Sequence, residues 1–175
     1  MLNLRSQGSD HPNIPKDRRS QPLMTLLTKP PGVLTESLTT TLVAFSPQEA
    51  YAAITILAIA SDGYLADEEL GTITSSLSRM HLFQHLRPDT MQRMYAKLFD
   101  ILRTEGADLL LESAKETLPS ELRESAFAMC CDLTLSDGLM SLDEQAFLRQ
   151  LHQLLEIPTE IADRILGVMQ IRNRG

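Results

Sequence analysis

Two acidic segments of this sequence carry residue types that bind hard metal ions. Ser61–Glu69 reads Ser-Asp-Gly-Tyr-Leu-Ala-Asp-Glu-Glu, and Ser136–Glu144, 75 positions later, reads Ser-Asp-Gly-Leu-Met-Ser-Leu-Asp-Glu. Carboxylate oxygens are the ligands that Ca²⁺, Mg²⁺ and Mn²⁺ prefer. If the two segments approach each other in the fold, they predict a divalent-metal site. The candidate ligands are Asp62, Asp67, Glu68, Glu69, Asp137, Asp143 and Glu144.

The spacing within each segment reproduces only the second half of a calcium-binding EF-hand loop. In that loop a glycine at the sharp turn is followed, six positions later, by a bidentate glutamate. Gly63 with Glu69, and Gly138 with Glu144, have this spacing. The positions of the first two Asp ligands hold alanine in the first segment and leucine in the second. A standard EF-hand is therefore excluded, whereas a looser carboxylate site stays open.

The same residues have a purely structural interpretation. Gly63 and Gly138 suit the left-handed position that commonly follows the end of a helix. Glu69 and Glu144 suit a capping box, and acids in a first helical turn are favoured by the helix dipole. Both interpretations require helices on either side of each Asp-Gly turn.

The hydrophobic pattern predicts those helices. Ser46-Pro47-Gln48-Glu49 combines an N-cap serine, a proline at the first helical position and a glutamate three residues after the cap, which is typical of a helix start. Ser141 to Glu144 forms a second capping box. Apolar residues at helical spacing predict helices that begin near residues 46, 66, 88, 120, 141 and 158, and a further helix between Gly106 and Pro119.

The predicted fold is all-α, with about seven helices in a compact bundle and two pseudo-symmetric helix–Asp-Gly turn–helix repeats that cover each other's apolar faces. This domain is expected to span residues 46–175. Residues 1–45 are rich in Pro, Ser and Thr and are predicted to be a mostly disordered arm. Within the arm, Leu23–Leu27 is the candidate for docking as a short helix or strand.

Composition and charge limit the classes of partner. The chain has 175 residues, 43% of them hydrophobic and 5% aromatic, a mix that suits close-packed helices. The formal net charge is −7, and residues 46–175 alone carry 20 acidic and 11 basic side chains, a net charge of −9. Nucleic acid is not expected as a partner, because phosphate binding needs clustered Lys and Arg. Cations and basic surfaces of protein partners are the expected ligands.

The sequence predicts a cytoplasmic protein. Residues 1–20 lack the apolar core of a secretory signal, and the longest apolar run, Ala52–Ala60, is too short to form a transmembrane segment. Cys130 and Cys131 are adjacent on a predicted helix and cannot easily form a disulfide, which fits a reducing compartment.

Other chemistry is weakly indicated. His81 and His85 have the i, i+4 spacing of a zinc-binding pair, but no further ligand is nearby in sequence, which favours a surface pair at a helix end. Cys130 and Cys131 lie in an apolar stretch where thiols usually serve packing. The chain has no glycine-rich phosphate loop and no Gly-x-Ser-x-Gly elbow. A non-enzymatic protein is therefore predicted.

The doubled Ser-Asp-Gly motif with its downstream acids, together with the all-α pattern and the acidic charge, resembles the TerB family of tellurite-resistance proteins. The resemblance covers residues 46–172, and the helical unit is also similar to the membrane-proximal domain of some DnaJ-like co-chaperones. It implies seven helices, an acidic patch that binds a divalent metal, and a stress-response role in protein assemblies, including peripheral membrane association through partners. Leu142 departs from it, because Leu142 replaces the acid found at Asp67 in the first segment.

The predicted function is a TerB-like module that binds a divalent cation or a basic partner through its acidic turns. The alternative is a co-chaperone-like or structural protein-interaction domain without metal, in which these acids only cap helices. A third class, a helical metal-dependent hydrolase, would require His81 or His152 to reach the acidic cluster.

Overall fold

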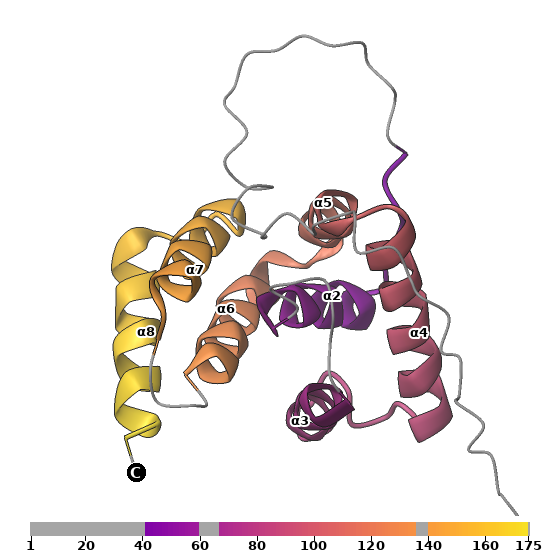
Figure 1. The fold of residues 1–175 in the computed structure, drawn as a ribbon, viewed down its shortest axis with the longest axis horizontal. Helices are drawn as coiled ribbons and strands as arrows, with labels where there is room; N and C mark the ends of the chain where they lie inside the picture. Colours follow the sequence, from indigo (N-terminus) through magenta and orange to yellow (C-terminus); the bar gives the residue numbers. More distant parts are fainter. Residues whose placement is uncertain (1–40, 60–66, 136–139, 175) are drawn as a thin grey trace, which may run out of the picture.

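The computed structural model describes residues 41–59, 67–135 and 140–174 and contains seven helices and no strand within these ranges (Figure 1). The helices begin at or next to the predicted positions, so the predicted all-α bundle is confirmed for this part of the chain. They are α2 (Pro47–Ile59), α3 (Asp67–Ser78), α4 (Pro88–Thr104), α5 (Ala107–Thr117), α6 (Ser120–Thr134), α7 (Leu142–Leu154) and α8 (Thr159–Arg172). None of these helices has the length and hydrophobicity needed to cross a membrane.

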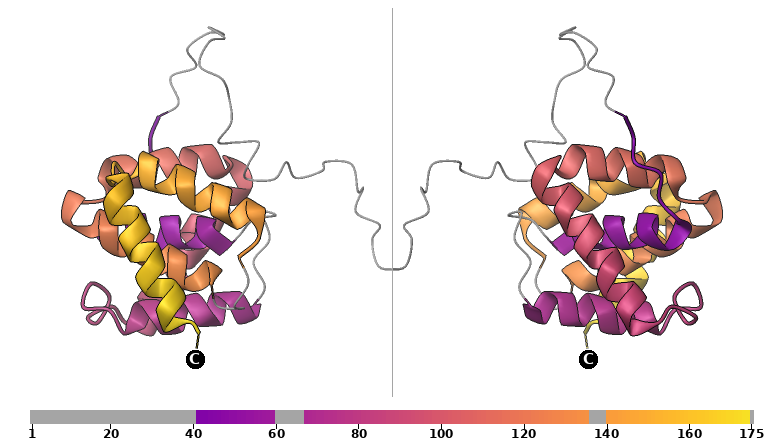
Figure 2. Two further views of the ribbon diagram at one scale, coloured as in Figure 1. Left: turned by 90° about the vertical axis from the view of Figure 1, so that its left-hand side faces the viewer. Right: turned by 90° about the vertical axis from the view of Figure 1, so that its right-hand side faces the viewer.

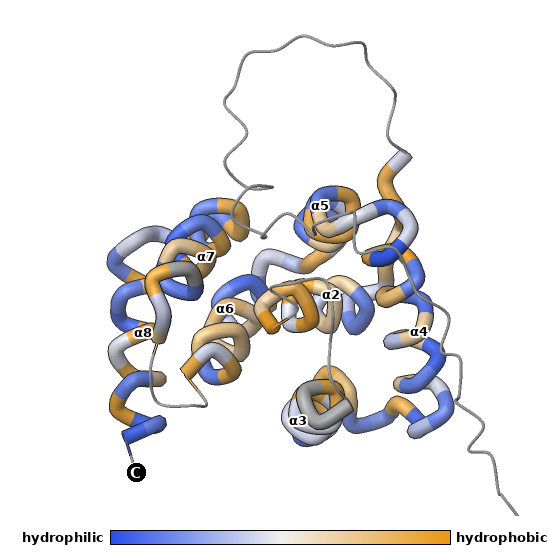
Figure 3. Tube along the Cα trace, in the orientation of Figure 1, coloured by the Kyte–Doolittle hydropathy of each residue, from blue (hydrophilic) through white to orange (hydrophobic). Residues whose placement is uncertain are grey.

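Helix α2 lies at the centre of the bundle. Every residue from Ala50 to Ala58 is buried, because the helix is apolar on all sides and is enclosed by neighbours. It packs against α3, α4, α5 and α6, with α3 and α5 on opposite sides of it (Figure 2). The tube of α2 is mostly orange or pale, whereas α4 and α8 also carry hydrophilic blue segments that face solvent (Figure 3). The core of the domain is therefore built around one helix.

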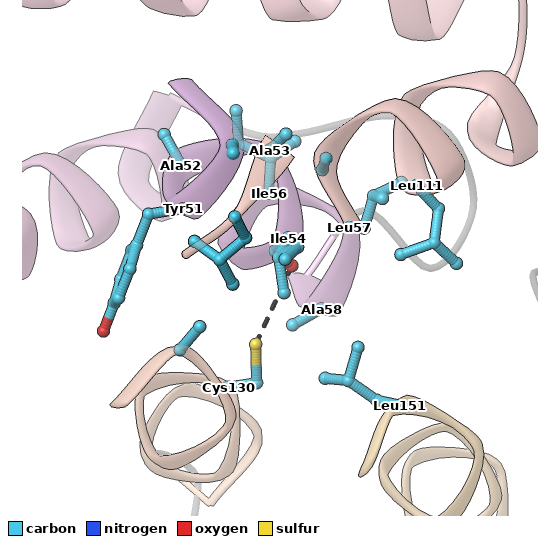
Figure 4. Packing of buried hydrophobic residues seen from close by; sticks show 14 of the residues in the cluster. Tyr51, Ala52, Ala53, Ile54, Ile56, Leu57, Ala58, Leu111, Cys130 and Leu151 are labelled. Carbon is cyan, nitrogen blue, oxygen red and sulfur yellow. Dashed lines mark hydrogen bonds between the residues drawn. The ribbon is translucent and has the colours of Figure 1, made fainter. Parts of the chain in front are cut away.

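Side-chain contacts join α2 to α6. The Tyr51 hydroxyl donates a hydrogen bond to the Ser125 carbonyl oxygen at 2.8 Å, and the Tyr51 ring packs edge-on against Phe83. The Cys130 thiol lies beneath α2 and donates to the Ile54 carbonyl oxygen at 3.7 Å (Figure 4). These contacts give α6 a fixed position against the central helix.

The described chain packs onto the domain before the predicted boundary at Ser46. The Val43 N–H donates to the hydroxyl of Ser113 in α5 at 3.0 Å, and Phe45 is buried. The Lys97 ammonium lies 5.2 Å from the centre of the Phe45 ring. Residues 43–45, which the predicted boundary assigned to the arm, therefore pack against the helical domain; residues 1–40 of the predicted arm lie outside the described residues.

Only one pair of helices keeps the offset of the sequence repeat. Helices α3 and α7 begin at Asp67 and Leu142, which are 75 residues apart, whereas the starts of α2 and α6 are 73 apart and those of α4 and α8 are 71 apart. α2 packs on α3 and α4, α6 packs on α7 and α8, and α2 packs on α6. The predicted repeat and the pseudo-twofold symmetry of its two units stay predictions.

Candidate functional site

The predicted metal ligands lie only partly within the described structure. Asp62 and Asp137 are outside the described residues altogether. For Asp67, Glu68, Glu69 and Asp143 the structure describes the backbone alone. Among the side chains that are described, no three His, Cys, Asp or Glu residues group closely enough to hold a metal ion. The carboxylate site therefore stays a prediction.

Glu144 is the predicted ligand whose contacts are described, and it caps α7. Its carboxylate accepts a hydrogen bond from the Ser141 N–H at 2.7 Å, and the Ser141 hydroxyl accepts one from the Glu144 N–H at 3.2 Å. This reciprocal pair is the capping box that the sequence predicted. One carboxylate oxygen of Glu144 is thus already engaged. Bidentate metal binding of the EF-hand kind would require Glu144 to give up its cap.

The start of α2 has the same arrangement with an added ion pair. Glu49 accepts from the Ser46 N–H at 2.8 Å, and the Ser46 hydroxyl accepts from the Glu49 N–H at 3.2 Å. Glu49 also lies 2.7 Å from the Lys97 ammonium in α4. Partial burial acts to raise the pKa of Glu49, but the hydrogen bonds and charge of Lys97 and the bonds from Ser46 together lower it below its usual value. Acids that follow a serine by three residues are caps in both of these helices.

An apolar groove of about 740 Å³ lies between α3 and α4. On α4 it extends from Pro88 to Phe99, about 16 Å at 1.5 Å per residue. Small polar side chains of α3 and Gln92 of α4 supply part of its lining, and the remainder is mainly apolar. The apolar side chains are those of Leu70, Leu86, Pro88, Met91, Ala96 and Phe99, with Tyr95 beside them. Gly71 also lines the groove, and a Cβ at this position would meet nothing within 4 Å.

Tyr95 places a buried hydroxyl at this groove. The residue is 4% exposed, and its hydroxyl has no hydrogen-bond partner of normal geometry. Burial raises the pKa of Tyr95, and the neighbouring Thr74 hydroxyl, although outside hydrogen-bonding geometry, acts in the opposite direction. The hydroxyl oxygen is itself buried, so Tyr95 contributes its ring and not an accessible polar group to the groove.

A second cleft, of about 480 Å³, lies between α7 and α8 and is more polar. Its buried lining includes Phe127 and His152, whose rings meet edge to face with centroids 6.3 Å apart. The His152 Nδ1 lies 3.1 Å from the Ile157 carbonyl oxygen. Because a carbonyl oxygen can only accept, Nδ1 is the donor in this contact.

The two clefts occupy equivalent places in the sequence repeat. At the offset of 75, six positions that line the first cleft match positions that line the second. The matching pairs are Leu70 and Gln145, Thr74 and Arg149, Ser78 and Gln153, Pro88 and Asp163, Met91 and Leu166, and Tyr95 and Gln170. The buried Leu77 likewise corresponds to His152. At these matched positions the first cleft is more apolar and the second carries mostly polar side chains. The helix starts of α4 and α8 are 71 residues apart, so the offset of 75 does not hold for them.

The remaining candidates do not form a reactive site. His81 and His85 are exposed in the turns between α3 and α4, not on one helical face, with ring centroids 6.5 Å apart. Cys130 and Cys131 are buried free cysteines. Burial raises the pKa of Cys131 to about 12, and burial together with Cys131 raises the pKa of Cys130 well above its usual value. These thiols pack in the core, as the sequence indicated.

Comparison with models of known families, with curated proteins and with solved structures yields no match. The resemblance to the TerB family therefore stays a prediction from the repeated motif.

Proposed function

We propose that this chain is a non-enzymatic protein-interaction module whose α3/α4 groove binds an apolar segment of a protein partner. The observation that carries the proposal is the groove itself. Ligand sites are typically concave and mainly apolar, and this groove has both properties. Leu70, Leu86 and Phe99 are half-buried and line it, so part of their apolar surface is open to a partner.

The shape of the groove supports a helical ligand. Its length of about 16 Å along α4 corresponds to about three turns of a bound helix. An amphipathic helix would place residues at i, i+3 or i+4, and i+7 against the apolar lining. A small-molecule site would need convergent polar groups to fix the orientation of its ligand. Here the buried polar group is the Tyr95 hydroxyl.

The proposal agrees with what the TerB resemblance implies, namely a cytoplasmic stress-response role, such as in tellurite resistance, carried out through protein assemblies. A co-chaperone-like role needs the same surface. Neither requires a chemical reaction at the groove.

Binding of Ca²⁺, Mg²⁺ or Mn²⁺ by the acidic turns is the second candidate function. It is favoured by the equivalent starts of α3 and α7, which bring the acids of both repeats into first helical turns. Metal binding and partner binding at the groove are compatible, and the two are tested separately.

The test of the groove is selection of ligands from a displayed library of helical peptides against the full chain. Selected peptides are expected to carry apolar residues at helical spacing. Gly71→Trp should weaken their binding roughly tenfold or more by filling the groove, while the matched variant Gly71→Ala should leave it unchanged. Peptides that bind Gly71→Trp as well as the wild type, or no enrichment at all, would contradict the proposal.

A further inference from the structure

We propose that, in the absence of a partner, the α3/α4 groove is occupied by residues 22–28 of the same chain. The N-terminal segment would then compete with partners for the groove and act as an internal inhibitor. This inference rests on the proposed function, because it takes the groove as the binding surface and names its resting occupant. Three observations support it.

The segment has the sequence of a short amphipathic helix. Residues 22–28 read Pro-Leu-Met-Thr-Leu-Leu-Thr, and Leu23, Leu26 and Leu27 have the i, i+3, i+4 spacing that places three leucines on one face. Pro22 suits a first helical position, and Pro30 suits a stop. Seven residues make about two turns, or about 10 Å, which fits within the groove.

The chain between this segment and the domain is long enough to reach the groove. The domain holds the chain at Val43, which bonds to Ser113, and at Phe45, which packs near Lys97 of α4. Ala96, the residue before Lys97, and Phe99 on the same helix line the groove. The 14 residues from 29 to 42 have a root-mean-square span of about 20 Å as a flexible linker. A tether of this length gives an effective concentration in the millimolar range, so a weak contact is sufficient.

Charge favours the same occupant. Residues 1–45 carry five basic and three acidic side chains, a net charge of +2, and the segment is flanked by Arg18, Arg19 and Lys29. The remainder of the chain carries −9. The first part of the chain is therefore attracted to the domain that follows it.

Paramagnetic relaxation in the full chain tests the contact. A nitroxide is attached to Thr28→Cys, and labelling is selective because Cys130 and Cys131 are buried. Docking predicts strong broadening of the Gly71 and Ala96 amide signals and none at Gln153, the counterpart of Ser78 in the second cleft. Leu23→Asp/Leu26→Asp should abolish the broadening, and Gly71→Trp should abolish it while Gly71→Ala retains it.

Several outcomes overturn the inference. Broadening that survives Leu23→Asp/Leu26→Asp, or that is equal at both clefts, shows an undocked tether. Broadening of a ¹⁵N-labelled chain by a separate spin-labelled chain shows that the occupant comes from a second copy. Failure here is distinguishable from failure of the proposed function, because groove-dependent peptide binding is measured independently. If the inference holds, Leu23→Asp/Leu26→Asp also strengthens the binding of selected peptides.

Discussion

Glu144 allows the two interpretations of the acidic turns to be separated quantitatively. As a cap, its carboxylate accepts from the Ser141 N–H at 2.7 Å in a box whose second bond is 3.2 Å. Glu144→Gln keeps an acceptor oxygen but loses the charge near the helix start, which should cost about 0.3–1 kcal/mol of unfolding free energy. Glu144→Ala removes the side-chain half of the box and should cost about 1 kcal/mol. Neither cost should depend on metal.

As a metal ligand, Glu144 would behave differently. An ion that binds only the native state at 100 times its dissociation constant stabilises that state by about 2.7 kcal/mol. The assay is urea unfolding of the full chain by far-UV circular dichroism, in EDTA and with excess Ca²⁺, Mg²⁺ or Mn²⁺. We expect the Glu144→Gln cost to be the same in every buffer. A gain of about 2.7 kcal/mol in the wild type that disappears in Glu144→Gln and in Asp62→Asn/Asp137→Asn would refute the capping interpretation and establish the metal site.

Three further predictions concern the core and its edge. The pKa of Glu49 is lower in the folded chain than its ordinary value of 4.5, so its contribution to stability is present above that pH and is lost as the pH falls below it. Glu49→Gln should therefore lose less stability on acidification than the wild type. Parallel curves of unfolding free energy against pH for the two proteins would contradict the lowered pKa. Raising the pKa of Cys131 from 9.0 to about 12 lowers its thiolate fraction about 1000-fold at pH 8. Cys130 and Cys131, both buried, should therefore react with a thiol reagent only after unfolding. Rapid labelling of the native protein would disprove their burial. Leu151→Ala should cost about 2–5 kcal/mol because Leu151 is 1% exposed, while Leu142→Ala, at 79% exposure, should change stability by less than about 0.5 kcal/mol; similar costs at both positions would argue against the packing of α7.

Helix boundaries were predictable from the sequence because local chemistry determines them. The Ser46 and Ser141 boxes use contacts within four residues of the chain, and Pro88, Gly106 and Pro119 interrupt helices through their own backbone properties. The structure places helix starts or ends beside each of these residues. Predictions that depend on a few neighbouring residues were therefore reliable.

Contacts between distant residues were not predictable in the same way. Phe83 has no helical period around it, yet it is buried against Tyr51 because the connection after α3 folds back toward α2. The arm was likewise predicted to end at residue 45, because the bond from Val43 to Ser113 and the contact between Phe45 and Lys97 join residues far apart in the sequence.

The candidate site was predictable only in part. The offset of 75 can be seen in the sequence. The two clefts, however, form between helices, and the hydrophobic periodicity of one helix does not predict the space between two. Glu144 was correctly recognised as a capping-box residue, whereas its role as a metal ligand stays a prediction. The apolar groove depends on how α3 and α4 are positioned around α2, which local sequence patterns do not determine.

The central position of α2 has a consequence for synthesis of the chain. This apolar helix is shielded largely by segments that follow it, and its Tyr51 contact with Ser125 spans 74 residues of sequence. At about 5–20 residues per second, roughly 4–15 s separate the emergence of these two residues from the ribosome. During this interval the most hydrophobic helix of the domain lacks its later partners and is exposed to chaperones or to aggregation. For the same reason neither repeat is expected to be a self-sufficient folding unit, and the domain should form in one late step when α6 becomes available.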